Sequence, residues 1–116
     1  MMRTRPIYAD SQLVVEQLPP GGELRFTGEI DGRNAPAVTR SIFGALNSRS
    51  DLHLDLSAAE FRDEAGLDAL LVAAGSLRSG RLVLHGLPPL IEAAIRAVAC
   101  GRSEKLAIRV GGPRMR

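Results

Sequence analysis

The sequence predicts a single domain of the α/β class, and three observations support this prediction. From residue 12 to residue 110, segments with the two-residue period of a strand alternate with segments of helical spacing, in the order β-β-α-β-α-β-α-β. The chain has 116 residues, enough to bury one hydrophobic core but not two. Aromatic residues make up only 3% of it, so the core must consist of leucine, alanine, valine and isoleucine. The same shortage disfavours binding modes in which bases or sugars stack on aromatic rings.

The first predicted elements form a β-hairpin. The first few residues are polar, and we expect residues 1–10 to form a flexible N-terminal segment, with the folded domain spanning residues 11–110. Residues 12–18 and 23–28 both alternate, and the Pro-Pro-Gly-Gly run between them predicts a turn. The glycines and acidic residues of 28–32 are expected to end the second strand.

The first helix is predicted to begin after Asn34. Asparagine is a favoured N-cap, and Pro36 then falls in the first turn, where its missing N–H costs nothing. Residues 47–50 predict the turn that follows. Three apolar residues share one face of this helix: Val38, Ile42 and Leu46.

Residues 51–67 change from strand to helix spacing within a short distance. Alternation from residue 51 to residue 57 predicts a strand, and a short polar turn is expected before Phe61. Asp63 is the natural N-cap of the next helix, which we expect to end near Ser79-Gly80. The apolar face of that helix comprises Leu67, Leu70, Leu71, Ala74 and Leu77.

The remaining elements are two short strands around a third helix. Strands are predicted at residues 81–85 and 105–110, and residues 111–116 are expected to form a flexible C-terminal tail. The segment Gly86-Leu87-Pro88-Pro89 should break the chain and start a helix that ends at Gly101. Its expected apolar face comprises Leu90, Ile91, Ala94, Ile95 and Val98.

The charge distribution disfavours direct nucleic-acid binding. The net charge is +2, but removing Arg3, Arg5, Arg114 and Arg116 leaves eleven basic against 13 acidic residues, so the predicted domain is mildly acidic. No run of five basic residues occurs. The single cysteine, the lack of an apolar signal region and the lack of a long apolar span predict a cytoplasmic protein, neither secreted nor inserted in a membrane.

The sequence offers little support for a cofactor, a metal or an enzyme. His53, Asp55 and His85 could be imagined as metal ligands, but nothing fixes their mutual spacing. Cys100 follows an apolar helical face, which favours a buried thiol, and no G-x-S-x-G motif occurs. The glycine pairs lack the residues of a phosphate-binding loop. We therefore expect no cofactor and no catalysis.

Four segments resemble, in order, the STAS family of sulfate-transporter and anti-sigma-factor-antagonist domains: residues 26–31, 54–57, 61–67 and 86–89. The resemblance covers about residues 12–110 and is nearest to the bacterial anti-sigma factor antagonists. It implies a small mixed sheet with helices packed mainly on one side. It also implies a partner, an anti-sigma factor that is an ATP-binding serine kinase-like protein.

The resemblance also identifies a regulatory position that this chain has altered. The family has Asp-Ser-Ser-Gly at the start of the helix after the central strand, and its second serine is phosphorylated. Here the four residues are Asp63, Glu64, Ala65 and Gly66, so Ala65 stands at the phosphoacceptor position without a hydroxyl. Ala65 could mimic the unphosphorylated state permanently, or Glu64 could supply a constant negative charge. We favour the first, because one carboxylate on a neighbouring residue lacks the charge and the acceptor oxygens of phosphate.

The predicted function is a non-enzymatic docking module that binds an anti-sigma factor and so frees a sigma factor for transcription. Asp63 and Glu64 could equally serve only to cap a helix and complement its dipole. The alternatives are an accessory STAS subunit of a transporter or sensory complex, and a STAS domain that senses a nucleotide or another small ligand. The docking surface is expected to include Asp31, Asp63, Glu64, Ala65, Gly66, Leu67 and Asp68.

Overall fold

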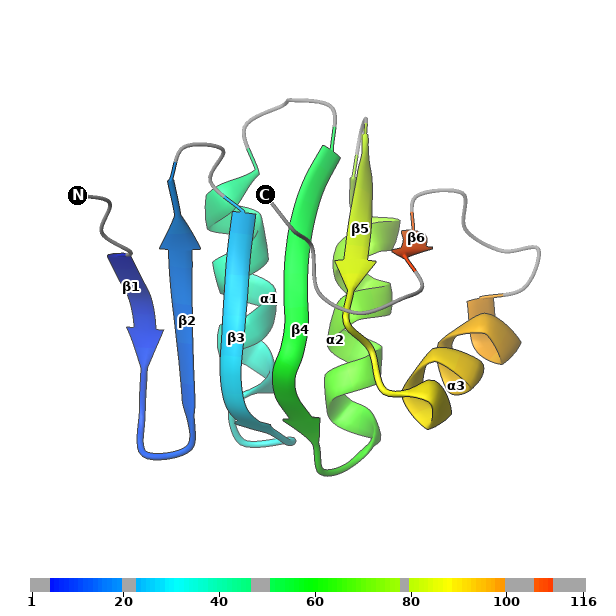
Figure 1. The fold of residues 1–116 in the computed structure, drawn as a ribbon, viewed down its shortest axis with the longest axis horizontal. Coiled ribbons are helices and arrows are strands. Elements are labelled where there is room, and N and C mark those ends of the chain that lie inside the picture. The colour runs from blue at the N-terminus through cyan, green and yellow to red at the C-terminus, as the bar shows by residue number, and fades with distance from the viewer. Residues whose placement is uncertain (1–4, 20–22, 47–50, 78–79, 100–105, 110–116) are drawn as a thin grey trace.

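The computed structural model describes residues 5–19, 23–46, 51–77, 80–99 and 106–109. In these ranges a six-stranded sheet has its strands in the order of the sequence (Figure 1). The elements are β1 (Arg5–Ala9), β2 (Leu13–Leu18), β3 (Glu23–Ile30), α1 (Ala35–Ala45), β4 (Asp51–Phe61), α2 (Glu64–Gly75), β5 (Arg81–His85), α3 (Pro89–Ala99) and β6 (Leu106–Arg109).

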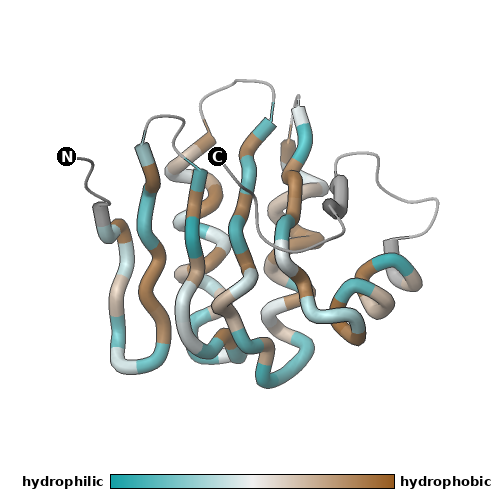
Figure 2. The backbone as a smooth tube through the Cα atoms, in the orientation of Figure 1, coloured by the Kyte–Doolittle hydropathy of each residue, from teal (hydrophilic) through white to brown (hydrophobic). Residues whose placement is uncertain are grey.

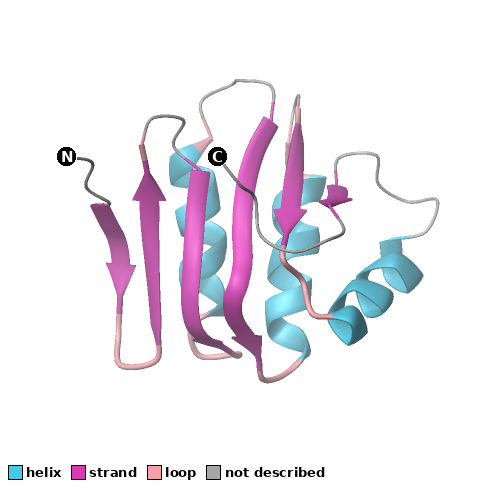
Figure 3. Cartoon of the chain, in the orientation of Figure 1, coloured by secondary structure: helices cyan, strands magenta, loops and turns pink. Residues whose placement is uncertain are grey.

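The sheet is mixed, as the family resemblance implied. Strands β1, β2 and β3 pair antiparallel, whereas β3, β4, β5 and β6 pair parallel. Helices connect the parallel strands, and α1 and α2 lie on the same face of the sheet (Figure 3). Because each crossover advances to the next strand in the same direction, right-handed connections place successive helices on one side.

The core lies between the sheet and this helical layer. Apolar and polar residues alternate along the central strands (Figure 2), and the apolar set faces the helices. The largest fully buried side chains include Leu13, Leu24, Phe26, Ile42, Leu54, Leu70, Leu84 and Ile95. Phe26 is the only aromatic residue in that set, so aliphatic side chains fill most of the core, as the composition predicted. In the described residues, no helix is long and apolar enough to cross a membrane.

Residues 5–9 were expected to belong to a flexible segment, and this is wrong, because they form strand β1. Ile7 and Tyr8 supply strand-favouring side chains, and Tyr8 packs against the core. Pro6 is tolerated because β1 is an edge strand, where a missing N–H need not break a ladder on both sides. Residues 1–4 and 110–116 lie outside the described residues.

Strand β3 does not end at Gly28 but continues to Ile30. Gly28 has a φ of 121°, and a β-carbon built on it would lie 2.0 Å from the Gln12 carbonyl oxygen. The glycine therefore permits a close backbone approach within the strand, which a turn-based interpretation of the sequence misses.

Strand β4 continues to Phe61, so the polar turn expected before that residue is absent. Between Arg25 and Thr27 of β3, the β4 partners move from Asp55 to Ala58, which leaves one extra residue on β4. Such a bulge reverses the alternation, and Ala59 is buried in place of the next even-numbered residue. The alternation of apolar and polar residues in the sequence stops here because the bulge turns the following side chains to the opposite face of the sheet.

Two helix predictions also need correction. Helix α2 ends at Gly75, with the Ser76 N–H bonded to the Val72 carbonyl 3.1 Å away, rather than near Ser79-Gly80. Leu90 was placed on the apolar face of α3, yet it is 84% exposed. The buried residue of that face is Ile95, with Ile91 packed against the core. The side chain of Val98 and the predicted stop at Gly101 lie outside what the structure describes.

Candidate functional site

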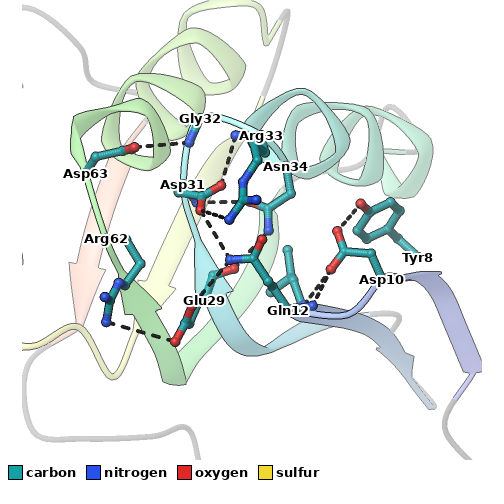
Figure 4. A network of polar contacts seen from close by, with 11 residues as sticks. Tyr8, Asp10, Gln12, Glu29, Asp31, Gly32, Arg33, Asn34, Arg62 and Asp63 are labelled. Carbon is teal, nitrogen blue, oxygen red and sulfur yellow. Dashed lines mark hydrogen bonds and ion pairs between the residues drawn. The ribbon is translucent and has the colours of Figure 1, made fainter.

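The carboxylate of Asp63 joins two loops at the carboxyl ends of β3 and β4. It is the N-cap of α2, as predicted, and its Oδ1 accepts a hydrogen bond from the Ala65 N–H at 2.9 Å. Its Oδ2 accepts another from the Gly32 N–H at 3.2 Å. One side chain thus caps a helix and fastens the β3–α1 loop to that helix (Figure 4).

Gly66 sets how closely α2 approaches the sheet. It is buried, and a β-carbon at this position would lie 2.7 Å from the Phe61 ring and 2.8 Å from the Ile30 Cγ2. Ile30 and Phe61 are register partners at the ends of β3 and β4. Gly66 therefore packs the helix start against both strand ends, and it offers no side chain to a partner.

Asp31 organises the β3–α1 loop. Its Oδ1 accepts from the Arg33 N–H at 2.9 Å, and its Oδ2 accepts from the Gln12 amide at 3.2 Å. The hydrogen bond from the Arg33 backbone, followed by that from Gln12, holds the pKa of the Asp31 carboxyl below its usual value near 3.8. Only 14% of the side chain is exposed, so most of Asp31 serves the loop itself.

Asn34 occupies the predicted N-cap position of α1, but its side chain makes no capping bond there. Instead its Oδ1 accepts from the Asp31 N–H at 3.0 Å, and its Nδ2 donates to the Glu29 carbonyl at 2.9 Å. The residue is 2% exposed. The Asn34 amide therefore holds the β3–α1 loop against the end of β3, and it does not cap α1 as was expected.

The sequence alone did not identify Gln12 as part of this site. Its amide donates to Asp31 and, at 3.3 Å, to the Glu29 carboxylate, so it ties the β1–β2 turn to the β3–α1 loop (Figure 4). Arg62 was also missed, and its guanidinium lies 3.9 Å from Glu29 and 3.3 Å from Glu60. The contacts of Gln12 with Asp31 and Glu29, and of Arg62 with Glu29, join residues that are distant in the sequence, so local patterns could not predict them.

The dependence of the stability of the domain on pH, in the acidic range, should reflect the ionisation of Asp31. Because its folded pKa is lowered, its carboxylate stabilises the fold at pH values above its usual pKa, and this contribution is lost as pH falls through the folded pKa. Asp31→Asn should therefore lower the urea midpoint at pH 7 more than at pH 3. An equal loss at both pH values would contradict this assignment.

The expected docking residues differ in exposure. Asp63, Glu64 and Asp68 are exposed, whereas Ala65 and Leu67 are half-buried. A β-carbon built at Gly32 would lie 3.8 Å from the Ala65 Cβ, so the Ala65 methyl lies beside the β3–α1 loop. The exposed acidic residues of this surface, Asp63, Glu64 and Asp68, all lie at the start of α2, whereas Arg33 is the exposed charged residue of the β3–α1 loop.

Of the three residues considered as metal ligands, only His53 and His85 lie in contact with each other. The His53 Nδ1 lies 2.7 Å from the His85 Nε2 across β4 and β5. Asp55 instead accepts from the Ser57 hydroxyl at 2.7 Å and lies 3.6 Å from the Arg25 Nε. Among the residues that the structure describes, no group of three or more His, Cys, Asp or Glu is arranged to hold a metal ion.

The strand order does not reverse in the parallel part of the sheet, where β3, β4, β5 and β6 follow one another. In open α/β sheets, a reversal of strand order is the usual place for a ligand. Here the loops after β3 and β4 are neighbours at one edge of the sheet, and the contact between Asp63 and Gly32 joins them.

These features define a small α/β domain with a mixed sheet, a helical layer on one face and a loop surface fastened by one carboxylate. A family model described as "Mlab, STAS domain" matches residues 13–107, and the chain belongs to the STAS domain family. The fold also resembles the crystal structure of an anti-sigma factor antagonist from Mycobacterium paratuberculosis. The TM-score is 0.57 at 22% identity, over 95% of this chain and 88% of that one. A search of curated proteins found no match.

Proposed function

We propose that this protein is a non-enzymatic docking module of the anti-sigma-factor-antagonist type. It acts in the cytoplasm, where it binds an anti-sigma factor with an ATP-binding, serine kinase-like fold and so regulates sigma-dependent transcription. Membership of the STAS family and the likeness to a solved antagonist support this proposal. The proposed docking surface is formed by Asp63, Glu64, Ala65, Leu67 and Asp68, and it is supported from below by Asp31, which organises the β3–α1 loop, and by Gly66, which sets the position of the helix start.

The observation that carries the proposal is the double role of Asp63. Its hydrogen bonds to Gly32 and Ala65 hold the β3–α1 loop and the first turn of α2 in one fixed arrangement. A preorganised surface loses little conformational entropy on binding. Exposed Glu64 and Asp68 then present negative charge to a partner with a basic face.

Docking is not gated by phosphorylation at residue 65, because the Ala65 side chain has no oxygen to accept a phosphoryl group. A phosphate there would enter the narrow space between α2 and the β3–α1 loop, beside the Asp63 carboxylate. The Ala65 methyl leaves this contact undisturbed. Glu64 carries a single negative charge on the preceding residue, so it does not reproduce the effect of a phosphate at residue 65.

Charge reversal on this surface tests the proposal. The partner is captured from cells of the source organism, purified, and titrated against the wild type by calorimetry. The double variant Glu64→Lys/Asp68→Lys should bind about tenfold more weakly or worse, because two attractive contacts become repulsive.

Glu23→Lys is the control for charge reversal elsewhere, since Glu23 begins β3 at the end of the strand away from the docking loops. It reverses one charge where the double variant reverses two, and it should leave the affinity within about twofold of wild type by the same measure. A loss of affinity as large as that of the double variant would contradict the assigned surface.

An accessory STAS subunit of a transporter or sensory complex is the second candidate. The lack of a hydroxyl at residue 65 favours it, because such a subunit needs no kinase-controlled release. The identity of the captured protein separates the two candidates. A transporter ATPase would support the accessory role, and a kinase-like protein would support the antagonist role.

A further inference from the structure

A hollow of about 240 Å³ lies between strand β1 and helix α1. Ile7, Ala37 and Gly44 form apolar parts of its wall, and Tyr8, Arg40 and Ser41 form polar parts. It involves none of the residues of the proposed docking surface. An inference from this hollow is therefore independent of the proposed function.

Ser41 is a buried polar group that lines the hollow. The residue is 8% exposed, and its side chain faces the hollow. A serine hydroxyl can donate a hydrogen bond to a ligand oxygen there.

Arg40 places a positive charge beside the same space. Its side chain is exposed, and across the described ranges its guanidinium forms no ion pair. The hydrogen bond to Asp10 raises the pKa of the Tyr8 hydroxyl, and the positive charge of Arg40 opposes part of that rise. A guanidinium presents several N–H donors in one plane and suits the paired oxygens of a carboxylate or phosphate.

The negative charge nearest to Tyr8 is already satisfied by the protein. Asp10 accepts a hydrogen bond from the Tyr8 hydroxyl, and it accepts two more from the N–H groups of Gln12 and Leu13, at 2.6 and 2.8 Å. These donors lower the pKa of the Asp10 carboxyl and spread its charge into the β1–β2 turn. They offset its repulsion of an anion held by Arg40.

We propose that the hollow between β1 and α1 binds a small organic anion, with its carboxylate or phosphate on Arg40 and Ser41 and its apolar body against Ile7 and Ala37. The volume lies below the range of about 300–1,000 Å³ that is typical of drug-sized ligands, so the anion has few non-hydrogen atoms. Weak binding, with a dissociation constant of about 1 mM, is expected for a probe of that size.

Titration of the full-length ¹⁵N-labelled protein by NMR tests this proposal. Hexanoate and butyl phosphate, added up to about 10 mM, should shift the amides of Tyr8, Ser41 and Gly44 with a dissociation constant near 1 mM. Hexanol, the uncharged match, should bind about tenfold more weakly. A response to one anion alone would identify its head group as the one recognised.

Two variants locate the site. Arg40→Gln should weaken anion binding about tenfold, because a charge-assisted contact is lost. Gly44→Leu should abolish it, because a β-carbon at Gly44 meets no atom within 4 Å and the added side chain can occupy the hollow. Gly75→Leu is the matched control, since Gly75 in α2 is equally open and does not line the hollow.

Three results would overturn the proposal. They are no amide shifts with either anion, equal binding of hexanol and hexanoate, and equal losses in the Gly44→Leu and Gly75→Leu variants.

Discussion

Replacing Gly28 by alanine is expected to destabilise the domain by about 3 kcal/mol or more, and to unfold much of it at 25 °C. Two costs combine. The φ of 121° is a conformation that residues with a side chain rarely adopt. The new β-carbon would also lie 2.0 Å from the Gln12 carbonyl oxygen, which is backbone and cannot rotate away.

The substitution should damage the docking loops as well as stability. The Gln12 carbonyl also accepts the Glu29 N–H at 2.9 Å, and the Gln12 amide bonds to Asp31. Moving this backbone away from Gly28 therefore displaces the residue that ties the β1–β2 turn to the β3–α1 loop.

Urea denaturation followed by circular dichroism measures the effect. Gly44→Ala is the control, because a β-carbon at Gly44 meets no atom within 4 Å. It should be neutral or stabilise the domain by about 0.5 kcal/mol, since alanine favours helices over glycine. If Gly28→Ala behaved like this control, the close approach of β2 and β3 would be wrong.

The largest functional effect should come from Ala65→Ser. This change places a hydroxyl at the proposed phosphoacceptor-equivalent position, in the first turn of α2, where the helix dipole favours added negative charge. The captured kinase-like partner should then phosphorylate the variant in the presence of ATP. The added charge of about −2 beside Asp63 should weaken binding about tenfold or more.

Mass spectrometry locates the phosphate, and calorimetry measures the affinity before and after the reaction. Ala93→Ser, at an exposed position in α3, is the control and should remain unmodified. A variant that is phosphorylated at residue 65 and binds with unchanged affinity would place the docking surface elsewhere on the molecule.

Local signals in the sequence predicted much of the fold. The cap at Asp63 and the strand at residues 81–85 depend on neighbouring residues, and the structure confirms both. The alternating pattern also identified β2 and the first part of β4, where Leu52, Leu54 and Leu56 are buried.

The features that were missed depend on contacts between distant segments. Gly28 was taken as a strand end because its constraint comes from Gln12, in the β1–β2 turn, which is distant in the sequence. Asn34 was predicted to cap a helix. Its actual bonds to Glu29 and Asp31 could not be predicted, because they exist only in the folded loop. Leu90 fitted a helical face, but the position of α3 leaves it in solvent.

In the candidate site too, the features set by neighbouring residues were predicted, and those set by distant contacts were not. Its acidic residues and Ala65 stand out in the sequence, because they form a short contiguous motif. The contact between Gly32 and Asp63 joins residues 31 positions apart, so only the structure shows that the two loops form one surface.

The central claim is that docking of the wild-type protein is not controlled by phosphorylation, because Ala65 has replaced the switch and no other residue has taken its place. The most direct test measures its affinity for the captured kinase-like partner before and after incubation with ATP and Mg²⁺, with mass spectrometry of the product. We predict equal affinities and no phosphate on the protein. Loss of binding together with phosphate on Ser57, Ser76 or another hydroxyl would contradict the claim, because it would show that the switch has moved to a different residue.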